Sequence, residues 1–363
     1  MRVLTVNAGS TSLKLERYDL GPALGAIADP PAPAYAAAPK PDDAEAALRE
    51  ATREPPDVVA HRFVRLPDGA PAVLRLDASA DDRIAAAGAD APLHDAPALR
   101  AVEILARLCP AVPQFAVSDS AFHRTMTAAA STYALPRELT QSGLRRLGYH
   151  GLSHEYAAHR GCALAGLDVM RSRVVTAHLG GGSSLCAVRG GASVDTTMGY
   201  TPLEGLPMAT RSGSVDPGLL IHLLRAGMPV DTLEQTLERR SGLLGMSGLS
   251  ADVRDLLAAG EDAAARLALD VLAWRLRSSL GAMVAVLGGA ELIVFTGGIG
   301  EHAAQIRTAA LDGGLGIGAL LNEERNARVT EGRIEAEPST VALAVVSARE
   351  GWQLARAVAT QTR

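Results

Sequence analysis

Two segments that lie almost half a chain apart follow one pattern: an apolar strand, a turn of small residues and a second strand. The first segment, residues 3–15, turns at the sequence NAGSTS (7–12), and the second, residues 174–188, turns at GGGSS (180–184). Glycine and serine allow such turns to expose backbone N–H groups and hydroxyls, which bind anions. One turn of this kind usually closes only a hairpin. The matched pair predicts two duplicated domains that face each other across a nucleotide.

Composition narrows the class of protein further. A chain of 363 residues, 48% hydrophobic and 21% charged, is long enough for two cores and typical of globular proteins. The net charge of −5 argues against sequence-independent binding of nucleic acid, which needs basic excess. Three cysteines without metal-ligand spacing argue against a disulfide framework, so we expect the reducing cytoplasm.

No segment has the pattern of a membrane or export signal. The N-terminus runs straight into a strand-like segment, without the basic, apolar and small-residue order of a signal peptide. The longest uncharged run, residues 278–290, is too short and too interrupted by glycine to span a bilayer. We therefore expect a soluble protein without membrane contact.

Strands alternate with helices along the chain, which predicts α/β layers with helices on both faces of a sheet. Apolar runs predict strands over 58–64, 115–117 and 291–296, the last of which leads into a glycine-rich loop at 297–300. Helical patterns cover 42–52, 96–108, 153–164, 216–226, 231–240, 261–288 and 350–360.

A series of motifs runs in fixed order along the chain. They are NAGSTSLK (7–14), APLH (91–94), SDSAFH (118–123), GYHGLSH (148–154), HLG (178–180), DTTMGYTPLEG (195–205), TRSG (210–213), SGLLG (241–245) and FTGGIGE (295–301). With these motifs the chain resembles, nearly end to end, the acetate and propionate kinases of the actin and sugar-kinase superfamily. Each motif alone is weak, and their number and order carry the resemblance.

The resemblance implies a fold and a reaction. The fold is two duplicated ribonuclease-H-like (actin-like ATPase) α/β domains with the active site in the cleft between them. The N-terminal domain is expected at 1–120 plus 348–363 and the C-terminal domain at 121–347. The implied reaction converts ATP and a short carboxylate into ADP and an acyl phosphate, with Mg²⁺ or alternatively Mn²⁺, usually in a homodimer.

Phosphoryl transfer to a carboxylate brings two anions together, so the protein must neutralise charge and align the reactants. The planar fork of arginine suits this task, and Arg62 and Arg211 match the catalytic arginines of the family. Because arginine is abundant in this chain, composition alone would favour interpreting both residues as ordinary surface arginines. The family motifs that flank them favour the catalytic interpretation instead. By the same resemblance His150 contacts the transferring group, and Asp119 orients the substrate and metal-linked water. Asp119 can also serve as a helix N-cap.

The resemblance also assigns the nucleotide and metal positions. Phosphate and base contacts fall on Ser10, Ser12, Lys14, His178, Gly180, Gly182, Asp252, Arg254, Gly298, Ile299 and Gly300. Asn7 and Glu350 match the metal-linked positions, in keeping with the preference of Mg²⁺ for few carboxylates, waters and phosphate oxygens. The alternatives are a solvent-exposed glutamate at the start of a helix for Glu350 and a strand-edge charge for Lys14. His123 and His154 are interpreted as structural.

The tail of the carboxylate is expected against Val64, Leu93, Tyr149 and Pro202, the family's apolar pocket positions. Tyr149 replaces the usual phenylalanine, and its hydroxyl is expected to narrow or polarise the pocket. One methylene is worth only about 1–3 kcal/mol of discrimination, so these four residues do not separate acetate from propionate.

Three departures from the family pattern bear on the substrates. Residues 63–69 read FVRLPDG where the family has VVHGG, and Gly181 and His302 each stand where an asparagine is usual. They leave open the phosphoryl donor (ATP, another NTP or pyrophosphate) and the acid. The leading hypothesis is a kinase for acetate. The alternatives are a kinase for propionate or another short acid, and a carboxylate-independent NTP hydrolase or binding protein.

Overall fold

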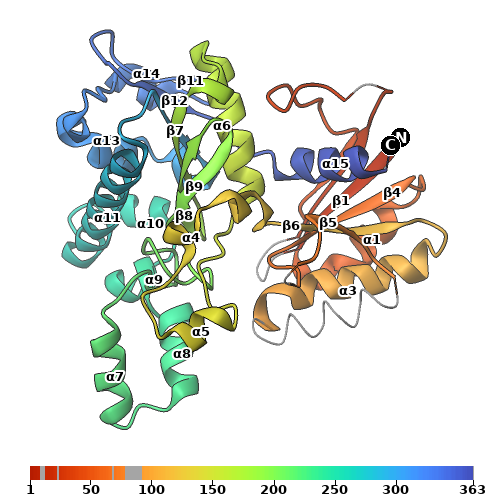
Figure 1. Ribbon diagram of the computed structural model, residues 1–363, viewed down its shortest axis with the longest axis horizontal. Coiled ribbons are helices and arrows are strands. Elements are labelled where there is room, and N and C mark those ends of the chain that lie inside the picture. Colours follow the sequence, from red (N-terminus) through yellow and green to blue (C-terminus); the bar gives the residue numbers. More distant parts are fainter. Residues whose placement is uncertain (9–12, 23, 68, 78–91, 363) are drawn as a thin grey trace. The chain divides into compact units, whose positions relative to one another are not determined.

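Two six-stranded sheets repeat the same strand arrangement, each in its own compact unit (Figure 1). The computed structural model describes residues 1–8, 13–22, 24–67, 69–77 and 92–362. The first unit comprises Met1–Ala121, Gly151–Tyr156 and Arg349–Arg363, and the second comprises Phe122–His150 and Ala157–Ala348. The units differ from the proposed domains chiefly at 151–156, and the domain boundaries stay a prediction.

The first sheet has the order β3-β2-β1-β4-β6-β5. Its strands are β1 (Arg2–Ala8), β2 (Leu13–Asp19), β3 (Tyr35–Ala37), β4 (Val58–Phe63), β5 (Val73–Arg75) and β6 (Gln114–Ser118). Strands β1, β2 and β3 form an antiparallel meander, β4 pairs parallel with β1, and β6 pairs parallel with β4.

The second sheet has the order β11-β12-β10-β7-β8-β9. Its strands are β7 (Arg173–Leu179), β8 (Ser183–Arg189), β9 (Ala192–Thr196), β10 (Leu292–Thr296), β11 (Gly332–Arg333) and β12 (Ala342–Val345). An antiparallel meander of β7, β8 and β9 is again followed by two parallel strands, β10 and β12. The two small-residue turns therefore occupy the same position, between the first two strands of each sheet. This duplication confirms the expected fold class.

Each of the seven predicted helices is present within a few residues of its expected position. In the first unit they are α1 (Ala44–Ala51), α3 (Pro92–Leu108) and α15 (Glu350–Gln361). In the second they are α4 (Ala128–Ser131), α5 (Arg137–Gln141), α7 (Pro217–Arg225), α8 (Val230–Arg239), α9 (Gly242–Ser247), α10 (Val253–Ala258), α11 (Ala263–Leu287), α12 (Gly297–His302), α13 (Ala304–Leu311) and α14 (Glu323–Arg328). Helix α6 (Gly151–Ala165) contributes to both units. Helices α4, α5, α9, α10, α12, α13 and α14, which the described residues also contain, were not predicted. Short 3₁₀ helices lie at Pro41–Asp43, Ala121–Thr125, Val169–Arg171 and Asp312–Gly316.

One local prediction was wrong. The glycine-rich segment after β10, expected as a loop, is the start of helix α12. The strand turns into the helix at Gly297, which has a φ of 79°. A Cβ there would lie 2.7 Å from the carbonyl oxygen of Leu179, so only glycine allows this close turn beside the end of β7. A run of glycines suggests a loop, but here one glycine makes the turn and the helix begins at once.

Each sheet buries both faces under helices. In the first unit Leu4 and Val6 of β1 pack with Leu105 of α3, on the face that α1 also covers. On the other face the ring of Trp352 in α15 lies 5.7 Å from that of Tyr18, centroid to centroid. These contacts explain why the chain's last described helix returns to its first strands.

In the second unit the long helix α11 supplies most of the core on one face of the sheet. The carboxylate of Asp262 caps its start by accepting a hydrogen bond from the backbone N–H of Ala265, and the left-handed Gly288 ends it. Helix α6 lies on the other face, where Gly161 contacts Val294 and Leu292.

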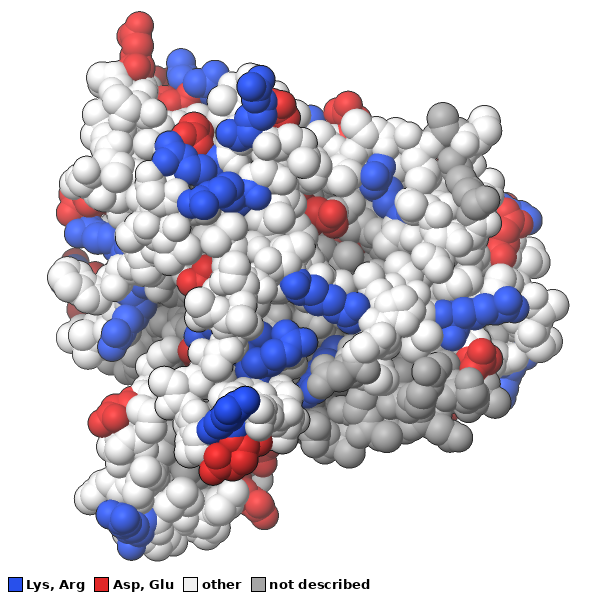
Figure 2. All heavy atoms as spheres, viewed as in Figure 1, with Lys and Arg blue, Asp and Glu red and all other residues white. Residues whose placement is uncertain are grey.

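The surface carries mixed charge. On the face drawn in Figure 2, basic and acidic side chains of the described residues lie interspersed. Among the described residues, no helix combines the length and the apolar character needed to cross a bilayer.

A buried histidine in the first sheet makes the stability of the protein depend on pH. His61 in β4 is fully buried, and its Nε2 donates a hydrogen bond to Oε1 of Gln114 at 2.7 Å, because Nε2 of Gln114 itself donates to the Val102 carbonyl. Burial lowers the pKa of His61 to about 4. Since the unfolded chain binds this proton near pH 6.5, the unfolded state takes up protons first as the pH falls.

We predict that the free energy of unfolding falls by about 3 kcal/mol between pH 7 and pH 4 through His61 alone. The matched variant His61→Gln keeps a hydrogen-bond donor for Gln114 and removes the titrating imidazole. The difference in free energy of unfolding between the wild type and this variant should therefore change by about 3 kcal/mol between pH 7 and pH 4. Chemical denaturation of both proteins at several pH values measures it. A difference that stays constant from pH 7 to pH 4 would contradict the prediction.

Candidate active site

In the first unit, two predicted catalytic residues meet at the carboxyl ends of neighbouring parallel strands. Arg62 lies at the end of β4, and Asp119 directly follows β6. Nη2 of Arg62 donates a hydrogen bond to Oδ2 of Asp119 at 2.7 Å. Asp119 is fully buried and the Arg62 side chain is 14% exposed. The buried carboxylate is therefore neutralised by the arginine and holds its guanidinium in one orientation.

The two predicted metal-linked residues also meet in this unit, although they are 343 positions apart. Nδ2 of Asn7, near the end of β1, donates to Oε2 of Glu350, the first residue of α15, at 2.7 Å. Lys14 is exposed and lies opposite Asn7 in the antiparallel pairing of β1 with β2. The described residues contain no group of three His, Cys, Asp or Glu side chains that could hold a metal ion. Asn7 and Glu350 thus offer one amide oxygen and one carboxylate.

Three predictions in the first unit are incompletely described. Ser10 and Ser12 lie outside the described residues. Leu93 belongs to α3, and its side chain is also outside the described part of the structure. Val64 follows β4 directly and is half-buried.

In the second unit, His150, His178 and Arg211 converge on the second small-residue turn. The rings of His150 and His178 lie 4.3 Å apart, centroid to centroid, and Nδ1 of His150 is 2.9 Å from Oγ of Ser184. A Cβ on Gly182 would lie 3.3 Å from Nε2 of His150 and 3.4 Å from Nη1 of Arg211. The turn therefore lies against an imidazole and a guanidinium at once.

Arg211 is held from two sides. Its Nε lies 3.3 Å from Oε2 of Glu238, and its Nη1 donates to the carbonyl of Pro202 at 3.4 Å. Pro202, predicted for the substrate pocket, thus lies next to a predicted catalytic arginine. The hydroxyl of Tyr149, predicted for the same pocket, donates to the carbonyl of Tyr200 at 2.5 Å. That hydroxyl is therefore engaged within the protein, which is the reason a tyrosine fits here.

A pocket of about 480 Å³ opens beside the same turn. Five residues predicted for nucleotide binding line it: Gly180, Asp252, Arg254, Gly298 and Ile299. They come from the turn after β7, from α10 and from α12, so the fold brings together segments far apart in sequence. Sequence reasoning did not place Ala209, Leu257 or Ala303, which also line the pocket, because apolar residues without a polar group carry no chemical signal. His302, noted only as a departure from the family pattern, also lines it.

Two nucleotide residues have structural partners of their own. Asp252 caps α10 by accepting from the backbone N–H of Arg254 at 2.8 Å and pairs with its guanidinium at 2.6 Å. The hydrogen bond from the Arg254 side chain, and to a lesser extent that from its backbone N–H, lowers the pKa of Asp252 to about 2. Gly300 is buried, and a Cβ there would lie 3.4 Å from the backbone of Phe295, so it packs α12 against β10 and is not part of the pocket wall.

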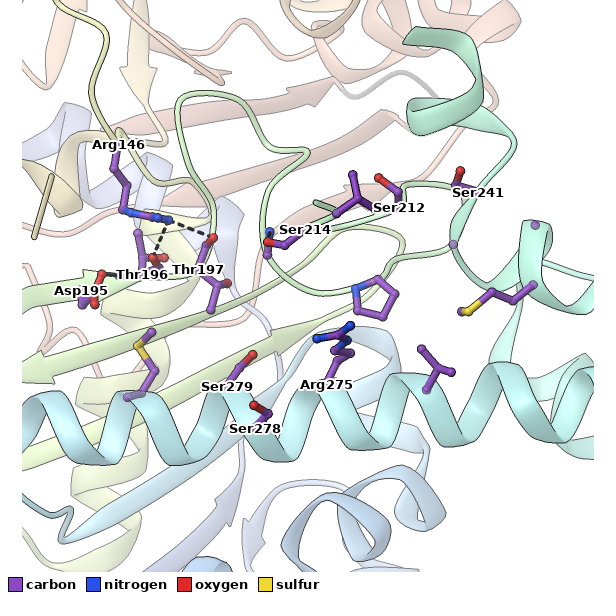
Figure 3. Close-up of a pocket in the computed structure, with 18 of the residues that line it drawn as sticks. Arg146, Asp195, Thr196, Thr197, Ser212, Ser214, Ser241, Arg275, Ser278 and Ser279 are labelled. Carbon is purple, nitrogen blue, oxygen red and sulfur yellow. Dashed lines mark hydrogen bonds between the residues drawn. The ribbon is translucent and has the colours of Figure 1, made fainter. Parts of the chain in front are cut away.

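A larger cavity of about 660 Å³ lies between α11 and the loops after β9 (Figure 3). None of the predicted site residues lines it. The guanidinium of Arg146 on its wall donates to the carbonyls of Thr196 and Thr197 at 3.1 and 3.0 Å. Arg146 therefore ties the segment before His150 to the end of β9.

The duplicated fold, with a glycine turn against an arginine and two histidines, defines a phosphotransferase of the two-domain ATPase class. The model of the acetokinase family matches residues 45–356. An acetate kinase of Gloeobacter violaceus is 48% identical over 272 residues, which cover 73% of this chain and 67% of that protein. This chain therefore belongs to the acetokinase family, and it is a kinase with a carboxylate as phosphoryl acceptor.

Solved structures agree over the whole chain. The acetate kinase of Porphyromonas gingivalis has a TM-score of 0.87 at 30% identity and covers 100% of both chains. A propionate kinase from Francisella tularensis has a TM-score of 0.86, also at 30% identity, and covers 98% of each chain.

We predict that Gly182→Ala lowers kcat roughly tenfold or more, because the added Cβ must displace the His150 ring and the Arg211 guanidinium by a few tenths of an ångström. The matched control is Gly181→Ala, where a Cβ would meet nothing within 4 Å. Steady-state kinetics of acyl phosphate formation compare the two. Equal kcat values for both variants would show that the positions of His150 and Arg211 against this turn do not matter.

Proposed function

We propose that this chain is an acetate kinase that transfers the γ-phosphoryl group of ATP to acetate, reversibly and by in-line displacement. The products are ADP and acetyl phosphate. The observation that carries the proposal is the convergence of His150 and Arg211, both within 3.4 Å of a Cβ position on the Gly182 turn. Membership of the acetokinase family supports it.

Arg211 and His150 share the task of stabilising the transferring phosphoryl group. Arg211 supplies a delocalised positive charge to the equatorial oxygens, and Glu238 and the Pro202 carbonyl set its orientation. When the Ser184 hydroxyl donates to Nδ1 of His150, Nε2 carries the hydrogen and donates to a phosphoryl oxygen. His178, stacked beside His150, contacts the nucleotide phosphates.

Arg62 and Asp119 act on the acceptor. The short ion pair fixes the guanidinium of Arg62, which pairs with the carboxylate of acetate and offsets repulsion between the two anions. Asp119 also orients a water linked to the metal. Val64, Leu93, Tyr149 and Pro202 form the apolar surround of the methyl group in this proposal.

The residues present suit a magnesium ion bound mainly through water and nucleotide phosphates. The amide nitrogen of Asn7 donates to the carboxylate of Glu350, so the two side chains lie together and supply an amide oxygen and a carboxylate as hard oxygen donors. The ion supplies charge neutralisation of the β- and γ-phosphates when bound. Lys14, opposite Asn7, adds positive charge beside these donors. Ser10 and Ser12, which lie outside the described residues, are proposed to contact the phosphates.

The adenine and ribose occupy the pocket of about 480 Å³, a volume in the range of small-molecule sites. Gly180 and Gly298 allow close approach of the phosphates, and Ile299 offers an apolar surface to the base. Asp252 and Arg254, fixed at the start of α10, border the ribose. Gly300 supports this wall from behind by packing α12 on β10.

A second candidate acceptor is propionate, because the solved propionate kinase resembles this chain as closely as the acetate kinase does. The acid is therefore decided by comparing turnover on acetate, propionate and butyrate. ATP loss that does not depend on any acid would favour the hydrolase alternative.

We also propose a cytoplasmic homodimer. Helix α11 buries one side in the core, yet its other side exposes Leu267 (58%), Trp274 (67%) and Val286 (45%). Leu267 and Trp274 are seven residues apart and so share one face of the helix, and large apolar side chains on an exposed helix face are typical of a surface covered by a partner. A second copy of the chain is the proposed partner.

The proposed compartment is the cytoplasm, because it supplies ATP and keeps the three free cysteines reduced.

We predict that Arg211→Ala lowers kcat for acetyl phosphate formation about 10³- to 10⁵-fold, the value of an arginine at a transferring phosphoryl group. The product is trapped as the hydroxamate, with Mg²⁺ and either ATP, GTP or pyrophosphate as donor. Arg225→Ala, at an exposed position in α7, is the control and should keep wild-type activity. No acyl phosphate from the wild-type protein with any acid would overturn the proposed function.

We predict that Trp274→Glu halves the molar mass in solution, since a charge would be buried on the apolar face of α11. The control Met170→Glu changes an apolar residue that is equally exposed, at 66%, but lies outside α11. Size-exclusion chromatography with light scattering measures both proteins. A wild-type monomer, or loss of the dimer in the control as well, would argue against this interface.

A further inference from the structure

The backbone at His150 adopts a conformation that side chains other than glycine rarely take. Its φ is 58° and its ψ is 26°, in the left-handed region. Among the described residues other than glycine, only His150 and Leu315 have positive φ. Such a conformation persists when the surrounding structure determines it, and it is common at functional sites. The contacts that hold His150 in this state therefore bear on its function.

The segment before His150 is fixed to the second sheet. Arg146 donates to three successive carbonyls after β9, two of them drawn in Figure 3. The backbone N–H of Gly148 donates to the carbonyl of Gly199 at 3.3 Å. Gly148 has a φ of 76°, and a Cβ on it would lie 2.6 Å from the ring of His123. The chain thus reaches His150 by passing directly over the imidazole of His123.

His123 contacts the peptide bond that enters His150. Its side chain is buried, and Nε2 lies 2.9 Å from the carbonyl oxygen of Tyr149. A carbonyl oxygen can only accept, so Nε2 carries the hydrogen. Nδ1 of the neutral ring then accepts from the hydroxyl of Ser193 at 2.8 Å. Cys186 lies 3.3 Å from the same hydroxyl, so the neighbours of His123 are also buried and fixed.

The peptide bond is planar, so the carbonyl of Tyr149 and the backbone nitrogen of His150 turn together. Fixing the direction of that carbonyl therefore limits φ of His150, and with it the direction in which the imidazole leaves the backbone. That imidazole reaches Ser184 with Nδ1 and the Gly182 turn with Nε2. A rotation of the Tyr149 peptide would move both contacts.

We propose that His123 is a positioning residue for phosphoryl transfer: it holds the Tyr149 carbonyl and so keeps His150 in its left-handed conformation, with the imidazole against the Gly182 turn. The hydroxyl of Ser193, which can donate to Nδ1, supports the tautomer that the Tyr149 carbonyl requires. The inference rests on the proposed function, in which His150 contacts the transferring group. It gives His123 a role in the reaction, in addition to its packing in the buried core.

Two substitutions at His123 separate its two hydrogen bonds. In His123→Gln the amide nitrogen reaches the position of Nε2 and can donate to the Tyr149 carbonyl. In His123→Asn the shorter amide reaches the position of Nδ1, so it keeps the contact with Ser193 and loses the one with Tyr149. We expect His123→Asn to lower kcat roughly 10- to 100-fold with both KM values within threefold. We expect His123→Gln to retain kcat within threefold.

A double-mutant cycle tests whether His123 acts through His150. In a His150→Ala background, His123→Asn should lower kcat no further, because the group that it positions is absent. Equal kcat values for His123→Asn and His123→Gln, or a full additional loss in the His150→Ala background, would overturn the inference. If His123→Asn does not fold, as circular dichroism would show, Ser193→Ala replaces it, since losing the tautomer control should lower kcat several-fold. An unchanged kcat in Ser193→Ala would then count against the inference.

The outcomes distinguish this inference from the proposed function. A wild-type protein that forms no acyl phosphate would overturn the proposed function. An active wild type with normal activity in His150→Ala would overturn the role of His150. An active wild type that loses activity in His150→Ala but not in His123→Asn would overturn only the role of His123.

Discussion

The hydrogen-bonded pairing of parallel strands in each sheet is the constraint on which the rest of the site depends. Parallel strands bring their carboxyl ends to one edge, where ligands of α/β sheets commonly bind. In the first sheet that edge carries Asn7, Arg62 and Asp119, from β1, β4 and the end of β6. In the second it carries His178 from β7 and the Thr296 end of β10. Two copies of one strand arrangement therefore carry different side chains at their carboxyl edges.

The two arginines differ in how firmly the protein holds them. Arg62 forms a 2.7 Å pair with a fully buried carboxylate, whereas Arg211 lies 3.3 Å from a partly exposed Glu238. A tightly paired arginine keeps one fixed direction, as suits a group that positions an acceptor. The two arginines thus have carboxylate partners that differ in burial and distance, which suits the two roles that we propose for them.

Much of this arrangement was predictable from the sequence. The matched turns predicted the duplication, apolar periodicity placed the sheets and the long helix α11, and the order of motifs identified the family. Arg211 and His150 were predicted as site residues through their flanking residues, since their own identity says little in a chain rich in arginine, and that assignment stays a prediction. The start of α12 was missed because local composition does not distinguish a glycine loop from a glycine turn that leads straight into a helix. His123 was interpreted as only structural, since its contact with the Tyr149 carbonyl leaves no trace in local sequence.

The sequence by itself determined which residue types stand at the strand ends and the turns, because these follow from local patterns of apolar residues, glycine and serine. Only the tertiary structure decided which of them meet. Asn7 contacts Glu350 because α15 packs back onto the first sheet, and His150 faces Gly182 because a buried histidine holds the preceding peptide. Contacts of this kind depend on strand register and helix packing between segments far apart in the chain, and no local pattern encodes them.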